Sequence, residues 1–300
     1  MIITHTSPDW DAITSCWLLQ RHGGLEEHEV VFVNTGNPDR ALLDAAAAVV
    51  DTGREYDVTR WRFDHHQLPG AEANATCAAH LVWRWLESRA SIPSAEYDAL
   101  MGIEDLIRLI FSGDTGRREY GADWSRSVGI HALLSAQKAK RLSDADLLAY
   151  GYQILDDLAA HLLARRQARA TLDAHTVYTS DDGMVRGLSG APQGATFAAF
   201  EAGARLVVFH SEAPATVSAG VMRGGEGDEP HCGALVKELL QDYDCNIPSV
   251  TPDVYDELTR WFRHPAGFFA GRGTAKAPDP RPLAVSVAEI AAAIDGVWRR

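Results

Sequence analysis

The chain has 300 residues, and its 41 acidic against 28 basic side chains give a formal net charge of −13. This balance argues against tight, nonspecific binding to long nucleic acid, which normally requires a basic surface, although it leaves room for a local basic groove. The 46% of hydrophobic residues can form one large or two medium cores, and the longest apolar runs are too short to cross a bilayer.

The cysteines are scattered, because Cys16, Cys77, Cys232 and Cys245 form no CxxC pair. The sequence therefore gives no sign of a zinc site or a redox dithiol. The chain leads from Met1 directly into an apolar run, without a charged and then apolar leader that ends in a cleavage site. These features predict a soluble cytoplasmic protein with no membrane partner.

Short apolar runs alternate with helical patterns in the first half of the chain. Strands are expected at residues 2–5, 30–33 and 48–51, and helices at 12–21, 76–88 and 97–111. The alternation predicts an α/β fold with a doubly wound parallel sheet. Ligands of such sheets bind beyond the carboxyl ends of the strands, where His5, Asp51 and His65 are expected to emerge. The last helix is expected to stop at Ser112-Gly113 and thereby to present Asp114.

A long helix is expected next, at residues 144–173, with an acidic start and a basic end that suit the helix dipole. Short strands follow at 177–178, 184–186, 206–209 and 216–218, with a helix near 234–240 and a terminal helix from 287. We therefore predict three regions. A first α/β domain covers residues 1–140, a helical linker covers 141–175, and a smaller C-terminal α/β domain covers 176–300.

Four short motifs at these expected ends carry most of the chemistry. They are His5-Thr-Ser-Pro-Asp9-Trp-Asp11, Asp51-Thr-Gly, Asp64-His65-His66 and Gly113-Asp114-Thr-Gly. Imidazoles and carboxylates are ligands that hard divalent ions such as Mn²⁺ and Mg²⁺ accept. Carboxylates that converge without a cation repel one another and cannot all stay ionised. A pair of metals would remove this penalty and make the cluster a site for phosphoryl hydrolysis.

Each motif also has a plainer interpretation. Asp11 could cap the helix that follows it while Asp9 is a turn residue, and Asp51 could be a solvated strand terminus. The paired histidines could be a coincidence in a loop. The occurrence of all four motifs together, each at a plausible strand or helix end, favours metal ligation.

The four motifs resemble those of DHH-superfamily phosphoesterases. The first to fourth family motifs correspond to HTSPDWDA, VVDTG, FDHHQ and SGDTG, in the family's order. Within the superfamily, the stretch VDTGREYDVTRWRFDHHQ followed by ATCAAHLVW is most similar to the melanocyte-proliferating-gene branch, the Myg-type exonucleases. A looser similarity to the C-terminal half of that branch lies in WFRHPAGFFAG.

The resemblance implies two divalent cations, with Mn²⁺ favoured and Mg²⁺ or Co²⁺ as alternatives. The implied ligands are His5, Asp9, Asp11, Asp51, His65 and Asp114. Asp51 and Asp114 would bridge both ions. His5 and Asp9 would hold the first ion, and Asp11 and His65 would hold the second. Residues 1–140 would accordingly form the catalytic domain, and residues 176–300 would bind substrate.

The resemblance also assigns roles beside the metals. His66 would contact the phosphate, and Asp114 would bridge the two ions. His66 and Asp114 are therefore the predicted catalytic residues. Asp64 would orient an imidazole without binding a metal itself. The remaining histidines, among them His131, have no ligand-like spacing and are predicted to be structural or exposed.

A second group of residues is predicted to contact substrate: Arg117, Arg223, Gly224, Gly225, His231, His264 and Arg272. The glycines with His231 resemble a family signature that holds a phosphate, but an acidic insertion at 226–229 separates them, so an ordinary surface hairpin is the alternative. His264 and Arg272 would flank a small-residue loop with a cationic edge. Arg117 would line the cleft mouth, unless it is a solvated loop arginine.

Together these observations favour a hydrolase that cleaves phosphodiester bonds with two metals. The branch resemblance favours 3′-to-5′ exonuclease action on RNA or short oligonucleotides, and the acidic balance favours a short substrate. One alternative is a cyclic-dinucleotide or small-nucleotide phosphodiesterase. An alternative of another class is a metal- or nucleotide-binding regulator without turnover. The expected partner is a phosphate-bearing substrate in a cleft between the two domains, and a homodimer is left open.

Overall fold

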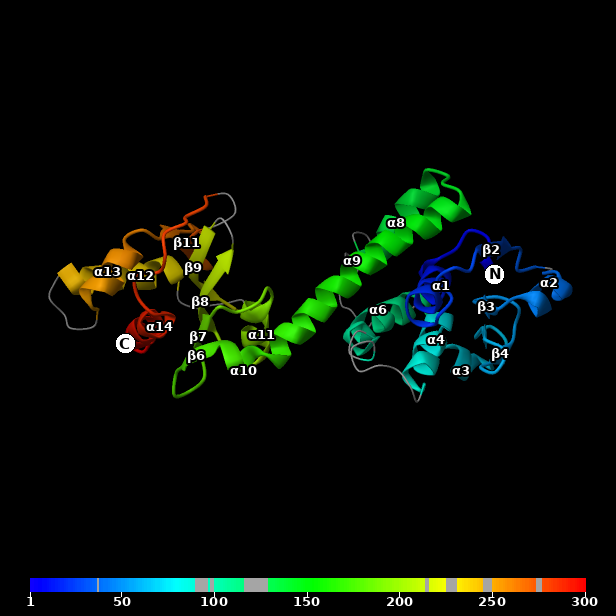
Figure 1. Cartoon of the computed structure of the whole chain (residues 1–300), viewed down its shortest axis with the longest axis horizontal. Helices are drawn as coiled ribbons and strands as arrows, with labels where there is room; N and C mark the ends of the chain where they lie inside the picture. Colours follow the sequence, from blue (N-terminus) through cyan, green and yellow to red (C-terminus); the bar gives the residue numbers. More distant parts are fainter. Residues whose placement is uncertain are drawn as a thin grey trace. The chain divides into compact units, whose positions relative to one another are not determined.

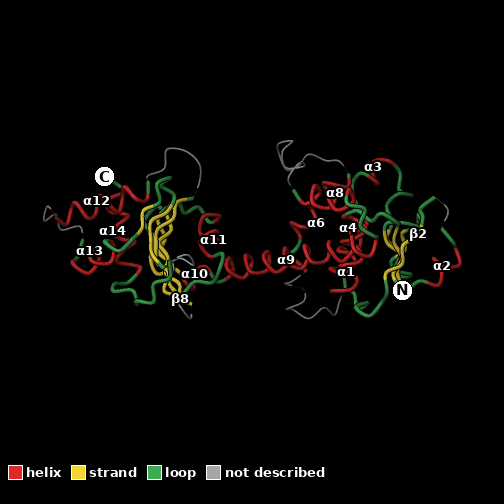
Figure 2. Tube along the Cα trace, turned by 90° about the horizontal axis from the view of Figure 1, so that it is seen from above, coloured by secondary structure: helices red, strands yellow, loops and turns green. Residues whose placement is uncertain are grey.

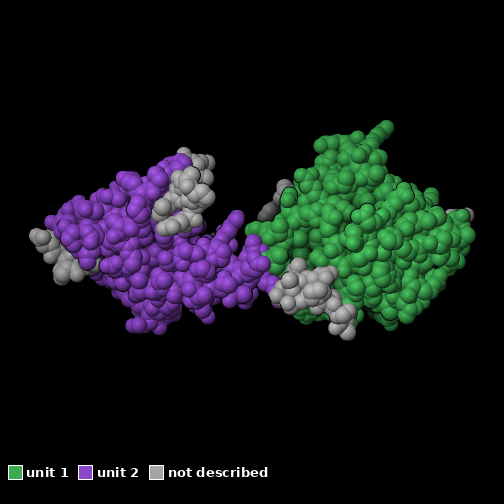
Figure 3. Space-filling model, in the orientation of Figure 1, with its two compact units in different colours: residues 1–163 green, residues 164–300 purple. Residues whose placement is uncertain are grey.

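The computed structural model describes residues 1–36, 38–89, 97, 100–115, 129–213, 216–224, 231–244, 250–273 and 277–300. The chain divides into two compact units, residues 1–163 and 164–300 (Figure 3). The division falls inside helix α9 (Asp144–Ala170), which confirms the long helix expected from residue 144. The predicted domain limits at residues 140 and 175 remain a prediction.

Unit 1 is built on a five-stranded sheet with the order β2-β1-β3-β5-β4. Figure 1 labels its strands β2, β3 and β4. The strands are β1 (Ile2–His5), β2 (Val30–Val33), β3 (Ala48–Val50), β4 (Tyr56–Asp57) and β5 (Arg62–Phe63). Strands β2, β1, β3 and β5 run parallel, and β4 is antiparallel to β5. The strands predicted in this half are therefore confirmed, and their parallel arrangement brings their carboxyl ends to one edge.

Helices cover both faces of this sheet (Figure 2). In unit 1 they are α1 (Trp10–His22), α2 (Arg40–Ala45), α3 (Gly70–Ala73), α4 (Ala78–Glu87), α6 (Glu104–Asp114), α8 (Ile130–Ala139) and the first part of α9. Because successive strand residues point to opposite faces, Ile2 packs in the core with α1 and α4, whereas Ile3 packs with Leu43 of α2. The predicted doubly wound α/β fold is confirmed.

Helix α6 runs further than the sequence indicated. We expected it to stop at Ser112-Gly113, but Asp114 is its last residue, and the backbone N–H of Thr115 closes the helix on Phe111 O at 3.0 Å. The expectation treated Gly113 as a stop signal. Instead, the glycine makes room for a neighbour, because a Cβ on Gly113 would lie 1.9 Å from Cε1 of His131.

Unit 2 contains a six-stranded mixed sheet with the order β10-β11-β9-β8-β7-β6. Its strands are β6 (Thr176–Thr179), β7 (Val185–Ser189), β8 (Leu206–Ala213), β9 (Thr216–Arg223), β10 (Phe262–Arg263) and β11 (Phe269–Arg272). Strands β7 and β8 are parallel, and the other neighbours are antiparallel. The expected strands at the start of this half are confirmed.

The helices of unit 2 also lie on both sides of its sheet (Figure 2). They are α10 (Leu172–His175), α11 (Ala195–Glu201), α12 (Cys232–Asp244), α13 (Pro252–Leu258) and α14 (Val287–Trp298). Val208 packs in the core with α12 and α14, while its neighbour Val207 packs in the core with α11. The C-terminal α/β prediction is confirmed. No helix within the described ranges is long and apolar enough to span a membrane.

Candidate metal centre

The first motif forms a turn that is held from several sides. It leaves β1 at His5, and Ser7 adopts a left-handed conformation with φ of 54°. The N–H of Ser7 donates to Asp144 Oδ1 at 2.9 Å, and its carbonyl accepts from Lys138 Nζ at 2.8 Å. Asp9 then caps α1, because its Oδ1 accepts from the N–H of Ala12 at 3.1 Å. The helix cap is therefore Asp9, and not Asp11 as the plainer interpretation proposed.

Asp11 is buried in the first turn of α1 and contacts a helix that is distant in the sequence. Its carboxylate accepts from the N–H groups of Ala78 at 2.8 Å and Ala79 at 2.6 Å, at the start of α4. An anion at this position satisfies unpaired helix N–H groups and interacts favourably with the helix dipole. Asp11 thus joins the first motif to the small-residue helix that follows the double histidine.

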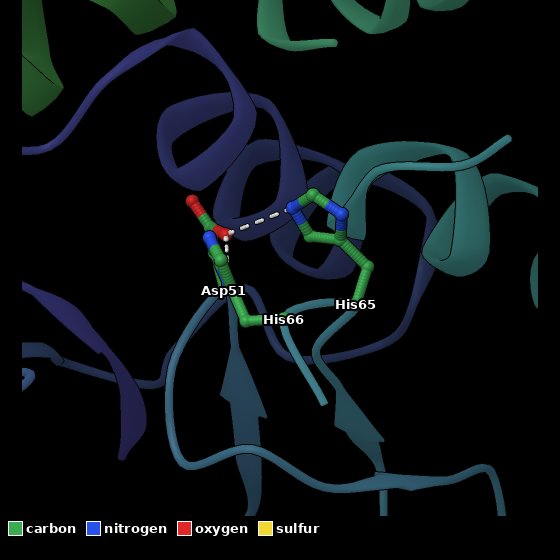
Figure 4. Close-up of side chains that lie close together, drawn as sticks. All are labelled: Asp51, His65 and His66. Atoms are coloured by element: carbon green, nitrogen blue, oxygen red, sulfur yellow. Dashed lines mark ion pairs between the residues drawn. The ribbon is translucent and has the colours of Figure 1, made fainter. Parts of the chain in front are cut away.

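Asp51 lies at the centre of the cluster. It follows β3, is 2% exposed, and turns the chain with φ of 52°. Its Oδ2 lies 3.1 Å from His5 Nε2. Its Oδ1 lies 3.9 Å from His65 Nε2 and 3.7 Å from His66 Nδ1, so that both imidazoles approach one carboxylate (Figure 4).

Asp64 fixes the orientation of His66. Its Oδ1 accepts from the backbone N–H of His66 at 3.0 Å and contacts His66 Nδ1 at 2.7 Å, while Oδ2 accepts from the N–H of Arg54. Burial alone would raise the pKa of Asp64, but these hydrogen bonds, led by that of His66, lower it below its usual value. The ring of His65 is held separately, by a 3.3 Å contact of Nδ1 with Ala73 O.

Asp114, at the end of α6, completes the group. Its Oδ2 lies 3.5 Å from His65 Nε2, and Asp11 Oδ2 lies 3.9 Å from the same nitrogen. The side chains form three groups, and within each group the possible ligand atoms lie within 4.8 Å of one another. The groups are His5, Asp9 and Asp51; Asp51, His65 and His66; and Asp11, His65 and Asp114. Because neighbouring groups share Asp51 or His65, all six predicted ligands form one continuous cluster, with His66 beside them.

The electrostatics of the cluster suit cations. Burial, and next the negative charges of Asp114 and Asp9, raise the pKa of Asp11 to about 7. Burial also raises the pKa values of Asp51 and Asp114. Among the described residues, the buried atoms Asp51 Oδ1 and His65 Nε2 have no hydrogen-bond partner. Crowded carboxylates with unused lone pairs, beside an imidazole nitrogen, fit a divalent-metal site.

Three of the substrate contacts predicted in the C-terminal half, Arg223, His231 and His264, belong to segments that pack against one another. The ring of His231 contacts Pro265 O through Nε2 at 3.1 Å, and a Cβ on Gly267 would lie 2.3 Å from Cδ2 of the same ring. The N–H of Arg223 donates to Phe268 O at 3.1 Å. The turn that begins at His264 therefore packs beside His231 and Arg223. Gly224 follows directly, and Arg117 and Gly225 lie outside the described residues.

The cationic edge expected at Arg272 needs correction. Residues 264–272 belong to a hairpin in which β10 pairs with β11. The Arg272 side chain is 3% exposed, and its Nε donates to Glu257 Oε1 at 2.5 Å, with Asp279 Oδ2 3.4 Å from Nη1. A buried arginine paired with two carboxylates offers little positive charge to a ligand.

Sequence reasoning missed a second wall beside the cluster. A pocket of about 260 Å³ is lined by Asp9, Asp11 and Asp114 on one side and by residues of α8 on the other. The α8 residues include His131, which the sequence predicted to be structural or exposed. The spacing of His131, Ser135 and Lys138 on one helix face was the available signal, but nothing in the sequence placed that face near the motifs.

The family model that matches this chain is described as MYG1_exonuc, an uncharacterised protein family (UPF0160), and it covers residues 1–87. That range includes the first three motifs and α4. No curated protein matches the chain.

Solved structures match it loosely. The pGpG-specific phosphodiesterase PggH from Vibrio cholerae is 13% identical, with 82% of this chain and 95% of that chain covered and a TM-score of 0.33. An exopolyphosphatase-related protein from Bacteroides fragilis is 14% identical, with 99% and 92% covered and a TM-score of 0.27. RecJ from Thermus thermophilus, in complex with Mn²⁺, is 18% identical, with 100% and 52% covered and a TM-score of 0.30.

The chain spans about half the length of RecJ. The family match covers the part of the chain that holds the first three motifs, and it confirms that residues 1–87 resemble the MYG1_exonuc family.

Proposed function

We propose that this protein is a divalent-metal-dependent phosphodiesterase that acts as a 3′-to-5′ exonuclease on RNA or short oligonucleotides. The observation that carries the proposal is the position of Asp51, which lies within reach of His5 on one side and of His65 and His66 on the other. A carboxylate shared in this way suits two cations held close together.

In the proposal, four of the six ligands would each hold one cation, and the other two would be shared by both cations. His5 and Asp9 would hold one cation and Asp11 and His65 the other, with the bridging roles given to Asp51 and to Asp114. When bound, the two cations would supply an acidified water and positive charge for the oxygens of a phosphate. Mn²⁺ and Mg²⁺ both suit a ligand set of carboxylates and imidazoles.

In this proposal His66 contacts the phosphate. Its Nδ1 is tied to Asp64, and its side chain is 54% exposed, so the ring can present Nε2 outward. The carboxylate of Asp64 raises the pKa of His66, which favours the charged imidazolium as a partner for phosphate oxygens. In this arrangement Asp64 orients the ring and His66 stabilises the negative charge of the phosphate.

The substrate class rests on two further observations. Residues 1–87 resemble the MYG1 exonuclease family. The net charge of −13 disfavours a long polyanion, whose binding normally requires a basic surface. A short oligonucleotide carries fewer phosphates and requires fewer basic contacts, so it agrees with both.

The test is a panel of short RNA and DNA oligonucleotides, labelled at either end, incubated with Mn²⁺ and with or without EDTA. A 3′-to-5′ exonuclease shortens 5′-labelled strands one nucleotide at a time and releases a labelled mononucleotide at once from 3′-labelled strands. Cyclic dinucleotides are included as competing substrates. Cleavage that persists in EDTA, or cleavage of cyclic dinucleotides alone, contradicts the proposal. Binding of Mn²⁺ and nucleotide without turnover would identify a regulator instead.

A further inference from the structure

The pocket beside the metal cluster has two chemically different walls. One wall carries Asp9, Asp11 and Asp114, and the other is a face of α8. On that face, His131, Ser135 and Lys138 are spaced by four and then three residues, so they lie next to one another along the helix. The three aspartates therefore lie on one side of the pocket, and hydrogen-bonding and cationic side chains lie on the other. The pocket has a volume of about 260 Å³.

Helix α8 is fixed to the first motif near both of its ends. At its start, the buried indole Nε1 of Trp10 donates to Ile130 O at 2.9 Å. Near its end, Lys138 Nζ donates to Ser7 O at 2.8 Å. Because Trp10 and Ser7 flank Asp9, these contacts hold the α8 face in a set position relative to the ligands. A wall held in this way is preorganised for a ligand.

The fourth motif contributes to the same wall. The ring of His131 packs so closely on Gly113 that a Cβ there would lie 2.0 Å from Nε2. Gly113 directly precedes Asp114. The glycine therefore allows the imidazole to sit beside a predicted metal ligand, which accounts for the small residue at this position.

The lining of the pocket favours a phosphate over a base. The indole of Trp10 is 3% exposed and its N–H is used by Ile130, so it offers no stacking surface. The apolar lining residues Ile110 and Leu134 are buried as well. Within the described part of the chain, Lys138 forms no ion pair with a carboxylate, and its ammonium group has three donors, of which Ser7 takes one.

We propose that Lys138 and His131 form a subsite for an anionic phosphate group of the substrate, on the side of the metal cluster that faces α8. The inference rests on the proposed function, because bound cations would neutralise the carboxylates that otherwise repel a phosphate. Hydrolysis of a diester leaves one product with a phosphomonoester of higher charge, and Lys138 is placed to bind that group.

The experiment uses the full chain loaded with Mn²⁺ and measures the affinity of inorganic phosphate by calorimetry, with adenosine as a probe that lacks phosphate. We expect Lys138→Met to weaken phosphate binding about tenfold or more, because a hydrogen bond to a charged group is lost. Lys138→Arg should restore most of the affinity, and His131→Asn should weaken it. Adenosine binding should not distinguish the variants.

Lys140→Met is the matched control, because Lys140 is an exposed lysine at the end of the same helix and does not line the pocket. It should bind phosphate like the wild type, and all variants should keep the wild-type Mn²⁺ content. Equal phosphate affinities of Lys138→Met and Lys140→Met overturn the subsite. A loss of Mn²⁺ in Lys138→Met overturns it too, because the lysine would then act on the ligand turn.

The two proposals fail in different ways. A wild-type chain that binds no Mn²⁺ contradicts the proposed function. In that case the subsite falls with it, because the carboxylates of the pocket would repel a phosphate. A wild-type chain that binds Mn²⁺, with equal phosphate affinities of Lys138→Met and Lys140→Met, overturns the subsite alone.

Discussion

At Asp51 a single carboxylate brings three of the four motifs together. His5 contacts one of its oxygens, while His65 and His66 approach the other. The sequence predicted this meeting, because parallel strands deliver their terminal residues to one edge of a sheet. The sequence did not predict the contact of Asp11 with Ala78, because that hydrogen bond joins residues far apart in the chain. Local propensity contains no information about such a partner.

The first prediction separates ligands from the phosphate contact. Asp114→Asn keeps the shape of the side chain but removes a charge proposed to be shared by both cations, so Mn²⁺ content and turnover should both fall, turnover by orders of magnitude. His66→Ala should keep most of the Mn²⁺ and lose turnover. Metal analysis beside kinetics on a cleaved phosphodiester checks this. If His66→Ala loses its Mn²⁺ as completely as Asp114→Asn, the division between the two roles is wrong.

At the scale of elements, close packing of α6 against α8 at Gly113 shapes one side of the site. The sequence indicated a helix over 97–111, whereas α6 begins at Glu104 and ends at Asp114, and its end was set too early because Gly113 was interpreted by its usual helix-ending tendency. Its actual partner, His131, comes from α8, and only tertiary packing brings the two together. In the same way, Arg272 was expected at a loop edge and instead pairs with Glu257 of α13 inside unit 2.

Gly113→Ala tests the packing of α6 against α8. The added methyl group requires His131 to move, so we expect the free energy of unfolding to fall by about 1–3 kcal/mol, as for other overpacked sites. Denaturant unfolding measures this. Gly296→Ala in α14 is the control, because no atom lies within 4 Å of its added Cβ, and it should be neutral or stabilising. Equal effects of the two changes would contradict the proposed packing.

The ion pair of Glu257 and Arg272 should make the stability of unit 2 depend on pH. Burial alone would raise the pKa of Glu257, but hydrogen bonds led by that of Arg272 lower it below the usual value of 4.5. A carboxyl group with a lowered pKa contributes stability above its unfolded value, and this contribution is lost as the pH falls through the folded value. Stability should therefore decrease as the pH is lowered below about 4.5.

Glu257→Gln should flatten that acid limb and cost about 3–5 kcal/mol at neutral pH, because it leaves the arginine charge buried without its main partner. Urea unfolding at several pH values measures both effects. The control is Glu201→Gln, which breaks the exposed pair with Arg165 and should cost about 1 kcal/mol or less. An unchanged acid limb in Glu257→Gln would remove the ion pair from the explanation.

At the scale of the whole molecule, the chain consists of two units with separate cores. Hydrophobic periodicity predicted both α/β regions, and the order of acidic and basic residues over 144–173 indicated the long helix. Periodicity does not determine how far each core extends along that helix. The division at residue 163 depends on which parts of α9 pack in the core of each unit, and the sequence pattern contains no such information.

Because the proposed ligands all lie in unit 1, Mn²⁺ should stabilise that unit selectively. At a free concentration of 100 times its dissociation constant, a ligand adds about 2.7 kcal/mol per site. We expect calorimetry to show an unfolding transition that Mn²⁺ raises and a second that it leaves in place, with Glu257→Gln lowering only the second. A Mn²⁺-induced shift of both transitions by equal amounts would contradict the assignment of the metals to unit 1.

The central claim is that the cluster around Asp51 holds two divalent cations. Its most direct test is the Mn²⁺ stoichiometry of the purified full chain, measured by calorimetric titration after removal of metals with EDTA, beside that of Asp51→Asn. We predict two Mn²⁺ ions per wild-type chain and a loss of both at the same free concentration in Asp51→Asn, since one carboxylate serves both sites. A wild-type chain that binds no Mn²⁺, or an Asp51→Asn chain that still binds two, would contradict the account.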